Sequence, residues 1–128
     1  MLQESDKENL EKLTILFAED EDISRDAVER ILKKRVKEVY AAKNGEEALE
    51  IYKNRDDIDV LITDIEMPKL NGIELIDKIK ELSPKTPAVV ITAFSDEIHK
   101  SPKADYHLTK PLNKNQLLEI LALIGSKK

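Results

Sequence analysis

The 128-residue sequence predicts one α/β domain, with a parallel five-stranded sheet that carries helices on both faces. Three observations lead to this prediction. Short apolar runs of strand length alternate along the chain with segments whose apolar residues recur at helical spacing. Some of these runs are apolar throughout, as expected of strands buried on both faces of a parallel sheet. The length is also that of a single domain with one core.

The chain begins with a polar, charged segment, residues 1–12, which carries only isolated leucines. We expect this segment to be a lead-in that is disordered or weakly helical, and the folded domain to span residues 13–125. A first strand is expected at residues 13–18, where an apolar run ends abruptly in acidic residues. Helical spacing then predicts an amphipathic helix at residues 23–34, with Asp22 available as its N-cap.

The alternation of strands and helices continues to the end of the chain. The expected elements are strands at residues 36–41, 60–63, 88–92 and 106–109, and helices at residues 48–52, 73–82 and 117–124. Asn44-Gly45 is expected to form a turn, and Ser83-Pro84 marks the end of a helix. Only 17 residues separate Thr92 from Lys110, and a serine-proline pair interrupts them. The fourth helix, near residues 95–100, is therefore expected to be short or irregular.

Composition excludes several kinds of protein. The chain has no cysteine, which excludes disulfides, thiolate metal sites and a cysteine nucleophile. No apolar run is long enough to span a membrane, and no apolar stretch at the N-terminus could serve as a signal sequence. The formal charge is −5 and the lysines are dispersed, which argues against nucleic-acid binding by this domain alone. We expect a cytoplasmic domain that contacts no membrane.

Four of the expected strands end in chemically distinctive residues: Glu19 and Asp20, then Asp64, Thr92 and Lys110. In a parallel sheet the carboxyl ends of all strands lie at one edge, where α/β proteins bind their ligands. Three carboxylates at one place repel each other unless a cation neutralises them. A site made of oxygen ligands is preferred by hard divalent ions, so the sequence predicts bound Mg²⁺, or Mn²⁺ in its place.

The same residues favour phosphoryl chemistry. A carboxylate beside a divalent ion can attack a phosphorus atom and form an acyl phosphate, while the metal and a lysine offset the charge on the phosphoryl oxygens. Asp64 is the best candidate for this nucleophile, because it lies between the paired acids and Lys110 in the expected strand order. Thr92 adds a hydroxyl that can donate a hydrogen bond to a phosphoryl oxygen.

Four segments together carry a resemblance to a known family. They are ILFAEDE at residues 15–21, VLITDIEMPKLNGIEL at residues 60–75, VVITA at residues 89–93 and LTKP at residues 108–111. In this order they resemble the receiver domain of response regulators, the phospho-accepting proteins of two-component signal transduction. The resemblance frames residues 13–124. It implies a flavodoxin-like, doubly wound sheet with the strand order 2-1-3-4-5.

The resemblance also implies a role for each acidic residue. Glu19 and Asp20 would form an acidic pocket, in which Asp20 binds the metal directly and Glu19 contributes directly or through water. Asp64 would be both the phosphorylation site and a metal ligand. The backbone carbonyl of Glu66 would be a further ligand.

The remaining implied roles belong to the conformational switch. Thr92 would be the switch hydroxyl, Lys110 the cation that pairs with the phosphoryl group, and Pro111 would follow a cis peptide bond. His107 stands where the family usually has an aromatic residue, and Tyr106 lies one position earlier. Two alternatives stay open for His107: a side chain that toggles with Thr92, or an ordinary strand histidine.

The resemblance implies a domain that receives a phosphoryl group from a sensor histidine kinase or a histidine phosphotransfer protein. It would regulate a downstream protein or an attached output domain, and catalyse only its own phosphorylation and slow dephosphorylation. The alternative is a pseudo-receiver, a docking module that works without phosphorylation. A related aspartyl-phosphate phosphatase needs a second aspartate close after its nucleophile. Glu66 occupies the position two residues after Asp64, which argues against that enzyme.

Overall fold

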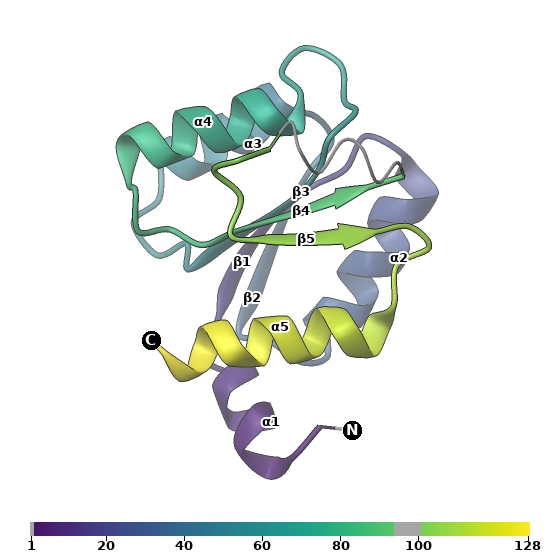
Figure 1. Cartoon of the computed structure of the whole chain (residues 1–128), viewed down its shortest axis with the longest axis vertical. Helices are drawn as coiled ribbons and strands as arrows, with labels where there is room; N and C mark the ends of the chain where they lie inside the picture. Colours follow the sequence, from purple (N-terminus) through teal and green to yellow (C-terminus); the bar gives the residue numbers. More distant parts are fainter. Residues whose placement is uncertain (1, 94–100) are drawn as a thin grey trace.

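A five-stranded, all-parallel sheet forms the centre of the computed structural model, which describes residues 2–93 and 101–128 (Figure 1). The strand order is β2-β1-β3-β4-β5, so the predicted fold class and strand order are confirmed. The strands are β1 (Thr14–Ala18), β2 (Glu38–Ala42), β3 (Val60–Asp64), β4 (Ala88–Thr92) and β5 (Tyr106–Thr109). Every residue of β1, β3 and β4 is buried, which explains why these three strands are almost continuously apolar.

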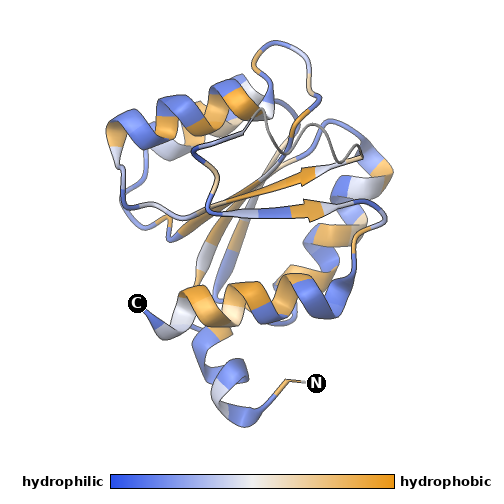
Figure 2. Ribbon diagram, in the orientation of Figure 1, coloured by the Kyte–Doolittle hydropathy of each residue, from blue (hydrophilic) through white to orange (hydrophobic). Residues whose placement is uncertain are grey.

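Helices cover both faces of the sheet, as predicted. They are α2 (Asp22–Lys33), α3 (Gly45–Lys53), α4 (Gly72–Leu82) and α5 (Lys114–Ser126). Figure 1 shows α3 and α4 on one face and α2 and α5 on the other. Figure 2 shows both hydrophobic and hydrophilic residues on each helix, whereas the central strands are mainly hydrophobic. Two apolar clusters result, one on each face of the sheet. Among the described residues, no helix is both long enough and apolar enough to cross a bilayer.

The starts of two helices differ from the sequence-based expectation. Helix α2 begins at Asp22 with Glu21 as its N-cap, so the prediction that Asp22 is the N-cap was wrong by one residue. Asn44-Gly45 is not a separate turn, because the Asn44 side chain caps α3 by accepting a hydrogen bond from the Glu47 N–H at 2.8 Å. A Cβ on Gly45 would lie 2.0 Å from the carbonyl oxygen of Leu70, so the loop before α4 requires glycine here.

An additional helix, α1 (Glu4–Leu10), lies before the first strand. The sequence predicted a lead-in that is disordered or weakly helical, whereas the structure packs α1 against α5. Leu10 is fully buried in the same cluster as Leu13, and Leu2 packs against that cluster. Leu2 and Leu10 were the signal that the polar composition of residues 1–12 concealed. The predicted domain boundary at residue 13 stays a prediction.

Helix α5 is buried on two sides as a result. Its buried residues include Leu117, Leu121 and Ile124 and a second set, Leu118, Ala122 and Gly125, each at helical spacing. The second set includes the glycine that α1 contacts. Gly125 lies so close to α1 that a Cβ at this position would be 2.3 Å from the carbonyl oxygen of Asn9. Lys128, just beyond α5, donates from Nζ to the carbonyl oxygen of Lys12 at 2.7 Å. The end of the chain thereby holds the α1–β1 connection.

The segment between β4 and β5 is described only in part. The short or irregular helix predicted near residues 95–100 lies outside the described residues. The segment that returns to the sheet is anchored at Asp105, whose Oδ2 accepts hydrogen bonds from the Ala88 N–H at 2.8 Å and from Lys80 Nζ at 2.7 Å. This anchor fixes the start of β5 beside the start of β4.

The contact between α1 and α5 predicts the effect of Gly125→Ala. Alanine is favoured over glycine in helices by about 1 kcal/mol, but the added methyl group has no room against Asn9. Overpacking of this kind costs about 1–3 kcal/mol, so we expect a net loss of stability. Urea unfolding followed by circular dichroism measures it. Ser126→Ala on the exposed side of α5 is the control and should change stability by less than about 0.5 kcal/mol. A gain in stability for Gly125→Ala would contradict the α1 contact.

Candidate functional site

A cavity of about 890 Å³ opens at the carboxyl edge of the sheet. The ends of β1, β3 and β4 and the residue after β5 contribute to its wall, as the position of ligand sites in parallel sheets predicts. Its lining includes six residues singled out from the sequence: Glu19, Asp20, Asp64, Glu66, Thr92 and Lys110. The structure thus brings together residues that lie up to 91 positions apart in the chain.

Three carboxylates converge in this cavity. Glu19, Asp20 and Asp64 each offer an oxygen, and these oxygens lie within 4.8 Å of one another. The side chains of Glu19 and Asp64 are almost completely buried, with residue exposures of 5% and 7%, whereas Asp20 is exposed. A partly buried set of like charges is unfavourable without a cation, and its all-oxygen donors suit a hard divalent ion. The donor set therefore fits a divalent metal.

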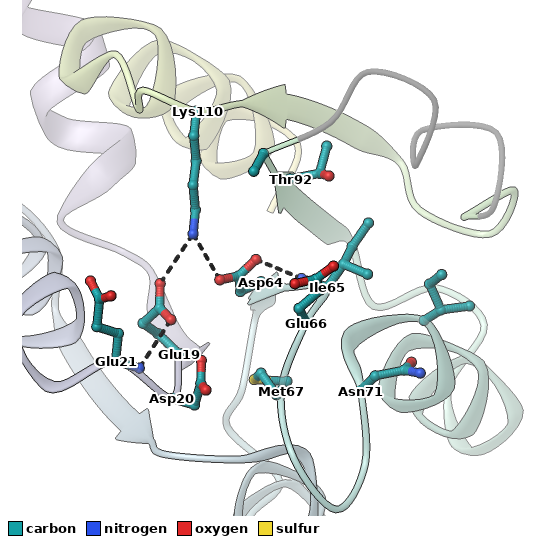
Figure 3. Close-up of a pocket in the computed structure, with 12 residues that line it drawn as sticks. Glu19, Asp20, Glu21, Asp64, Ile65, Glu66, Met67, Asn71, Thr92 and Lys110 are labelled. Carbon is teal, nitrogen blue, oxygen red and sulfur yellow. Dashed lines mark hydrogen bonds and ion pairs between the residues drawn. The ribbon is translucent and has the colours of Figure 1, made fainter.

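Hydrogen bonds on both oxygens orient the carboxylate of Asp64 (Figure 3). Its Oδ1 accepts from the Ile65 N–H at 2.8 Å, and its Oδ2 accepts from Lys110 Nζ at 2.9 Å. The same Lys110 nitrogen lies 3.8 Å from Oε1 of Glu19. The Thr63 hydroxyl donates to the backbone carbonyl of Asp64 at 2.8 Å. The side chain and backbone of Asp64 are therefore both held in place before any ligand arrives.

The electrostatic environment of this site shifts two titrating groups. Burial, followed by the nearby charge of Asp64, raises the pKa of Glu19 to about 7 against the opposing effects of the Glu21 N–H and Lys110. Burial alone would lower the pKa of Lys110. The hydrogen bond to Asp64 and the charges of Asp64 and Glu19 outweigh it and raise the pKa of Lys110 above its usual value. Lys110 is therefore a permanent cation of the site near neutral pH.

Gly72 allows the loop after β3 to pass close to the backbone of Asp64. The Gly72 N–H donates to the carbonyl oxygen of Ile65 at 2.8 Å, and a Cβ on Gly72 would lie 2.1 Å from the carbonyl oxygen of Asp64. Glycine at position 72, within the segment 60–75 that carries part of the resemblance, is needed for this close approach. Asn71 caps α4 by accepting from the Glu74 N–H at 2.9 Å. The loop therefore enters α4 directly beside the cavity.

The strands β4 and β5 bring Thr92 and Lys110 together. Thr92 is buried and pairs in register with Thr109, and the Lys110 N–H donates to the carbonyl oxygen of Thr92 at 2.8 Å. The Lys110-Pro111 peptide bond is cis, as the resemblance implied. His107 does not line the cavity. Its Nε2 lies 3.1 Å from the carbonyl oxygen of Ser101, the first described residue of the segment that leads into β5.

Sequence reasoning did not identify every residue of the site. Met67, Asn71 and Ile73 also line the cavity, and they stand in or near the segment already noted after Asp64, which was the available signal. Arg25 was missed because it lies on the first turns of α2 and binds backbone carbonyls, which no residue pattern reveals. The roles assigned to individual residues, including Glu66 as a ligand through its carbonyl, stay predictions.

Comparisons with known proteins agree with this geometry. Residues 15–122 match the family described as response regulator receiver domain. The chain is 39% identical over 115 residues to a cyclic di-GMP phosphodiesterase of Thermotoga maritima, covering 87% of this chain but 29% of that protein. It is 31% identical to the chemotaxis protein CheY of Halobacterium salinarum, covering 84% of this chain and 92% of that protein.

One solved structure is informative about ligands. The response regulator TrrA of Thermotoga maritima, solved in complex with Mg²⁺ and BeF, superposes with a TM-score of 0.81 at 30% identity and covers 88% of this chain and 98% of that chain. The similarity of fold therefore extends over most of this chain and nearly all of TrrA.

The buried position of Glu19 predicts a pH dependence of stability in metal-free buffer. Its pKa rises from 4.5 to about 7 on folding, so the folded protein holds a proton that the unfolded chain releases between these values. We therefore compare the free energy of unfolding of the wild type with that of Glu19→Gln. The difference in favour of the wild type should be largest below pH 4.5, decrease by up to about 3 kcal/mol between pH 4.5 and 7, and stay constant above pH 7.

Urea unfolding across this pH range, with a chelator present, measures the difference. Glu81→Gln, on the exposed side of α4, is the control for loss of one surface carboxylate. A wild-type advantage that grows as the pH rises would contradict the assignment, because it would mean that folding favours the charged form of Glu19.

Proposed function

Since this chain belongs to the response regulator receiver domain family, we propose that it accepts a phosphoryl group on Asp64 in a Mg²⁺-dependent reaction. One observation supports this proposal above all. The Asp64 carboxylate lies 2.9 Å from a cation, Lys110, and within a cluster of three carboxylates whose oxygens lie within 4.8 Å. A carboxylate beside a lysine and a divalent ion is the arrangement that nucleophilic attack on phosphorus requires.

The transfer proceeds by displacement at phosphorus. An Asp64 carboxylate oxygen supplies the electron pair for the new O–P bond, and the bond from phosphorus to the donor breaks, so that the donor leaves with that electron pair. The donor is a phosphohistidine of a kinase or phosphotransfer protein, or a small acyl phosphate. Lys110 pairs with a phosphoryl oxygen as its contact with Asp64 is replaced. Slow hydrolysis by water breaks the same O–P bond and releases phosphate.

The carboxylates of Glu19, Asp20 and Asp64, with the backbone carbonyl of Glu66, would hold the metal. When bound, Mg²⁺ supplies positive charge that neutralises the carboxylates and the incoming phosphoryl oxygens. Mn²⁺ has similar oxygen preferences and would serve in its place. Support for this assignment comes from the oxygen-only donor set and from TrrA, a relative whose structure contains Mg²⁺ and BeF.

Phosphorylation would then change the positions of Thr92 and the fifth strand. The Thr92 hydroxyl donates to a phosphoryl oxygen, and β5 responds because the Lys110 N–H is bonded to the Thr92 carbonyl at 2.8 Å. Through the Ser101 carbonyl, 3.1 Å from its Nε2, His107 links β5 to the preceding segment. A two-state rearrangement of this region is the output signal.

The partners follow from this chemistry. A sensor histidine kinase or histidine phosphotransfer protein supplies the phosphoryl group in the cytoplasm, and a downstream protein or attached domain responds. The chain spans 29% of the Thermotoga maritima phosphodiesterase that it resembles, which shows the kind of longer protein in which such a domain occurs. We propose no metabolic reaction for this domain beyond its own phosphorylation and dephosphorylation.

Incubation with acetyl phosphate and Mg²⁺ tests the proposed function. Intact-mass spectrometry should detect one added phosphoryl group on the wild type and none on Asp64→Asn, which lacks the nucleophile. Lys110→Ala should label at least 10-fold more slowly, because a charge-assisted contact to the transferred group is lost.

Asp105→Asn is a matched control, because it removes a carboxylate that pairs with a lysine outside the cavity. It should be labelled like the wild type. Labelling of Asp64→Asn to the wild-type level would overturn the choice of nucleophile. If the wild type is not labelled by acetyl phosphate and does not bind beryllofluoride, the pseudo-receiver alternative replaces the proposed function.

A further inference from the structure

Arg25 reaches back from the first turns of α2 to the loop that carries the acidic pair. Its Nη1 donates to the carbonyl oxygen of Glu19 at 3.0 Å and lies 3.5 Å from the carbonyl oxygen of Asp20. Its Nη2 donates to Oδ1 of Asp22 at 2.5 Å. The Arg25 side chain is largely buried, with an exposure of 17%, although its partner Asp22 is exposed. One guanidinium thus contacts Glu19 and Asp20 in the β1–α2 loop and also Asp22, the first residue of α2.

The contacts of Glu19 show what this arrangement accomplishes. The Glu19 N–H donates to the carbonyl oxygen of Ala42 at 3.0 Å, and the Glu21 N–H donates to Oε2 of Glu19 at 3.2 Å. With the Arg25 contact on its carbonyl oxygen, the backbone of Glu19 is held on both sides. Its Oε1 is then left toward the cavity, where it lies 3.8 Å from Lys110.

The two cations of this region contact different groups. Lys110 pairs with the carboxylates of Glu19 and Asp64, whereas Arg25 binds the backbone carbonyls behind the carboxylates of Glu19 and Asp20. Arg25 is not among the residues that line the cavity. It therefore acts on the site through the loop.

We propose that Arg25 is a positioning residue: it fixes the backbone of Glu19 and Asp20 so that their carboxylates meet Asp64 in a geometry that binds a divalent cation. This inference rests on the proposed metal-dependent function and deepens it. Outer residues that orient metal ligands commonly contribute 10-fold or more to metal affinity, although they never touch the ion.

Positioning by Arg25 and simple electrostatics predict opposite changes in Mg²⁺ affinity when Arg25 is replaced by a neutral residue. Removal of a positive charge near three carboxylates makes the site more negative, and by Coulomb attraction alone the site should bind Mg²⁺ more tightly. Loss of positioning has the opposite effect, since the loop must then be ordered at the expense of binding free energy. The direction of the change in Mg²⁺ affinity therefore distinguishes the two roles.

The geometry also requires arginine in particular. Two different nitrogens of the planar guanidinium bind the Glu19 carbonyl and the Asp22 carboxylate at the same time. A lysine at this position would keep the charge but has a single nitrogen on a flexible stem, and could not reproduce this fork. Arg25→Lys consequently keeps the positive charge at this position but removes the two-nitrogen geometry of the guanidinium.

The experiment is calorimetric titration of the full chain with Mg²⁺ for wild type, Arg25→Gln, Arg25→Lys and Arg55→Lys. We expect the Mg²⁺ dissociation constant to rise about 10-fold in Arg25→Gln and by a smaller factor in Arg25→Lys. Arg55→Lys is the matched control, because Arg55 forms a comparable fork with Asp57, at 2.9 and 3.0 Å, that does not line the cavity. It should bind Mg²⁺ like the wild type.

Thermal unfolding in metal-free buffer accompanies each titration, so that a change in affinity is compared between folded proteins. If Arg25→Gln does not fold, Arg25→Lys decides the matter. Wild-type or tighter Mg²⁺ affinity in the folded Arg25 variants overturns the positioning role and leaves the proposed function intact. If the wild type itself binds no Mg²⁺, the proposed metal-dependent function fails, which is a distinct result.

Discussion

The convergence of Glu19, Asp20 and Asp64 at one edge of the sheet is the constraint on which the rest of this structure depends. Their oxygens lie within 4.8 Å of one another, and two of the three side chains are almost fully buried. Such a cluster is unfavourable for the folded state, as the raised pKa of Glu19 indicates. The parallel sheet makes it possible, because β1 and β3 end side by side at the same edge, and the apolar residues of the buried strands β1, β3 and β4 supply stability that offsets the cost of the cluster.

The surrounding backbone is organised to keep these groups in position. Gly72 permits the loop after β3 to pass within contact of Asp64, and Asn71 ends that loop by capping α4. On the other side, Arg25 binds the carbonyls behind the acidic pair, while Lys110 faces the carboxylates themselves. A site that is arranged before its ligand binds loses less free energy to ordering, which is the general advantage of such preorganisation.

Two parts of the chain lie outside the four segments that carry the resemblance. Helix α1 precedes the residues that match the family, and it covers one buried side of α5 through the close contact at Gly125. Any partner that uses α5 must therefore bind its remaining exposed side or displace α1. The connection between β4 and β5 is the other part, and its described end is anchored by the Lys80–Asp105 pair. Among the described residues, neither the α1–α5 contact at Gly125 nor the Lys80–Asp105 pair contributes to the lining of the cavity that holds the three carboxylates.

The sequence by itself determined the α/β class, the sheet with its two covered faces, and the six residues that meet in the cavity. It could do so because hydrophobic periodicity specifies strands and helices, and because all strand ends of a parallel sheet meet at one edge. Only the tertiary structure decided the role of Asn44-Gly45 as a helix start, the packing of α1 and the contacts of Arg25. Each of these depends on groups that a residue pattern does not display. Glycine is required at position 45 because the backbone of Leu70 passes close to it. Helix α1 packs against a helix more than 100 residues away in the chain. Arg25 binds carbonyl oxygens whose direction is set only when the loop has folded.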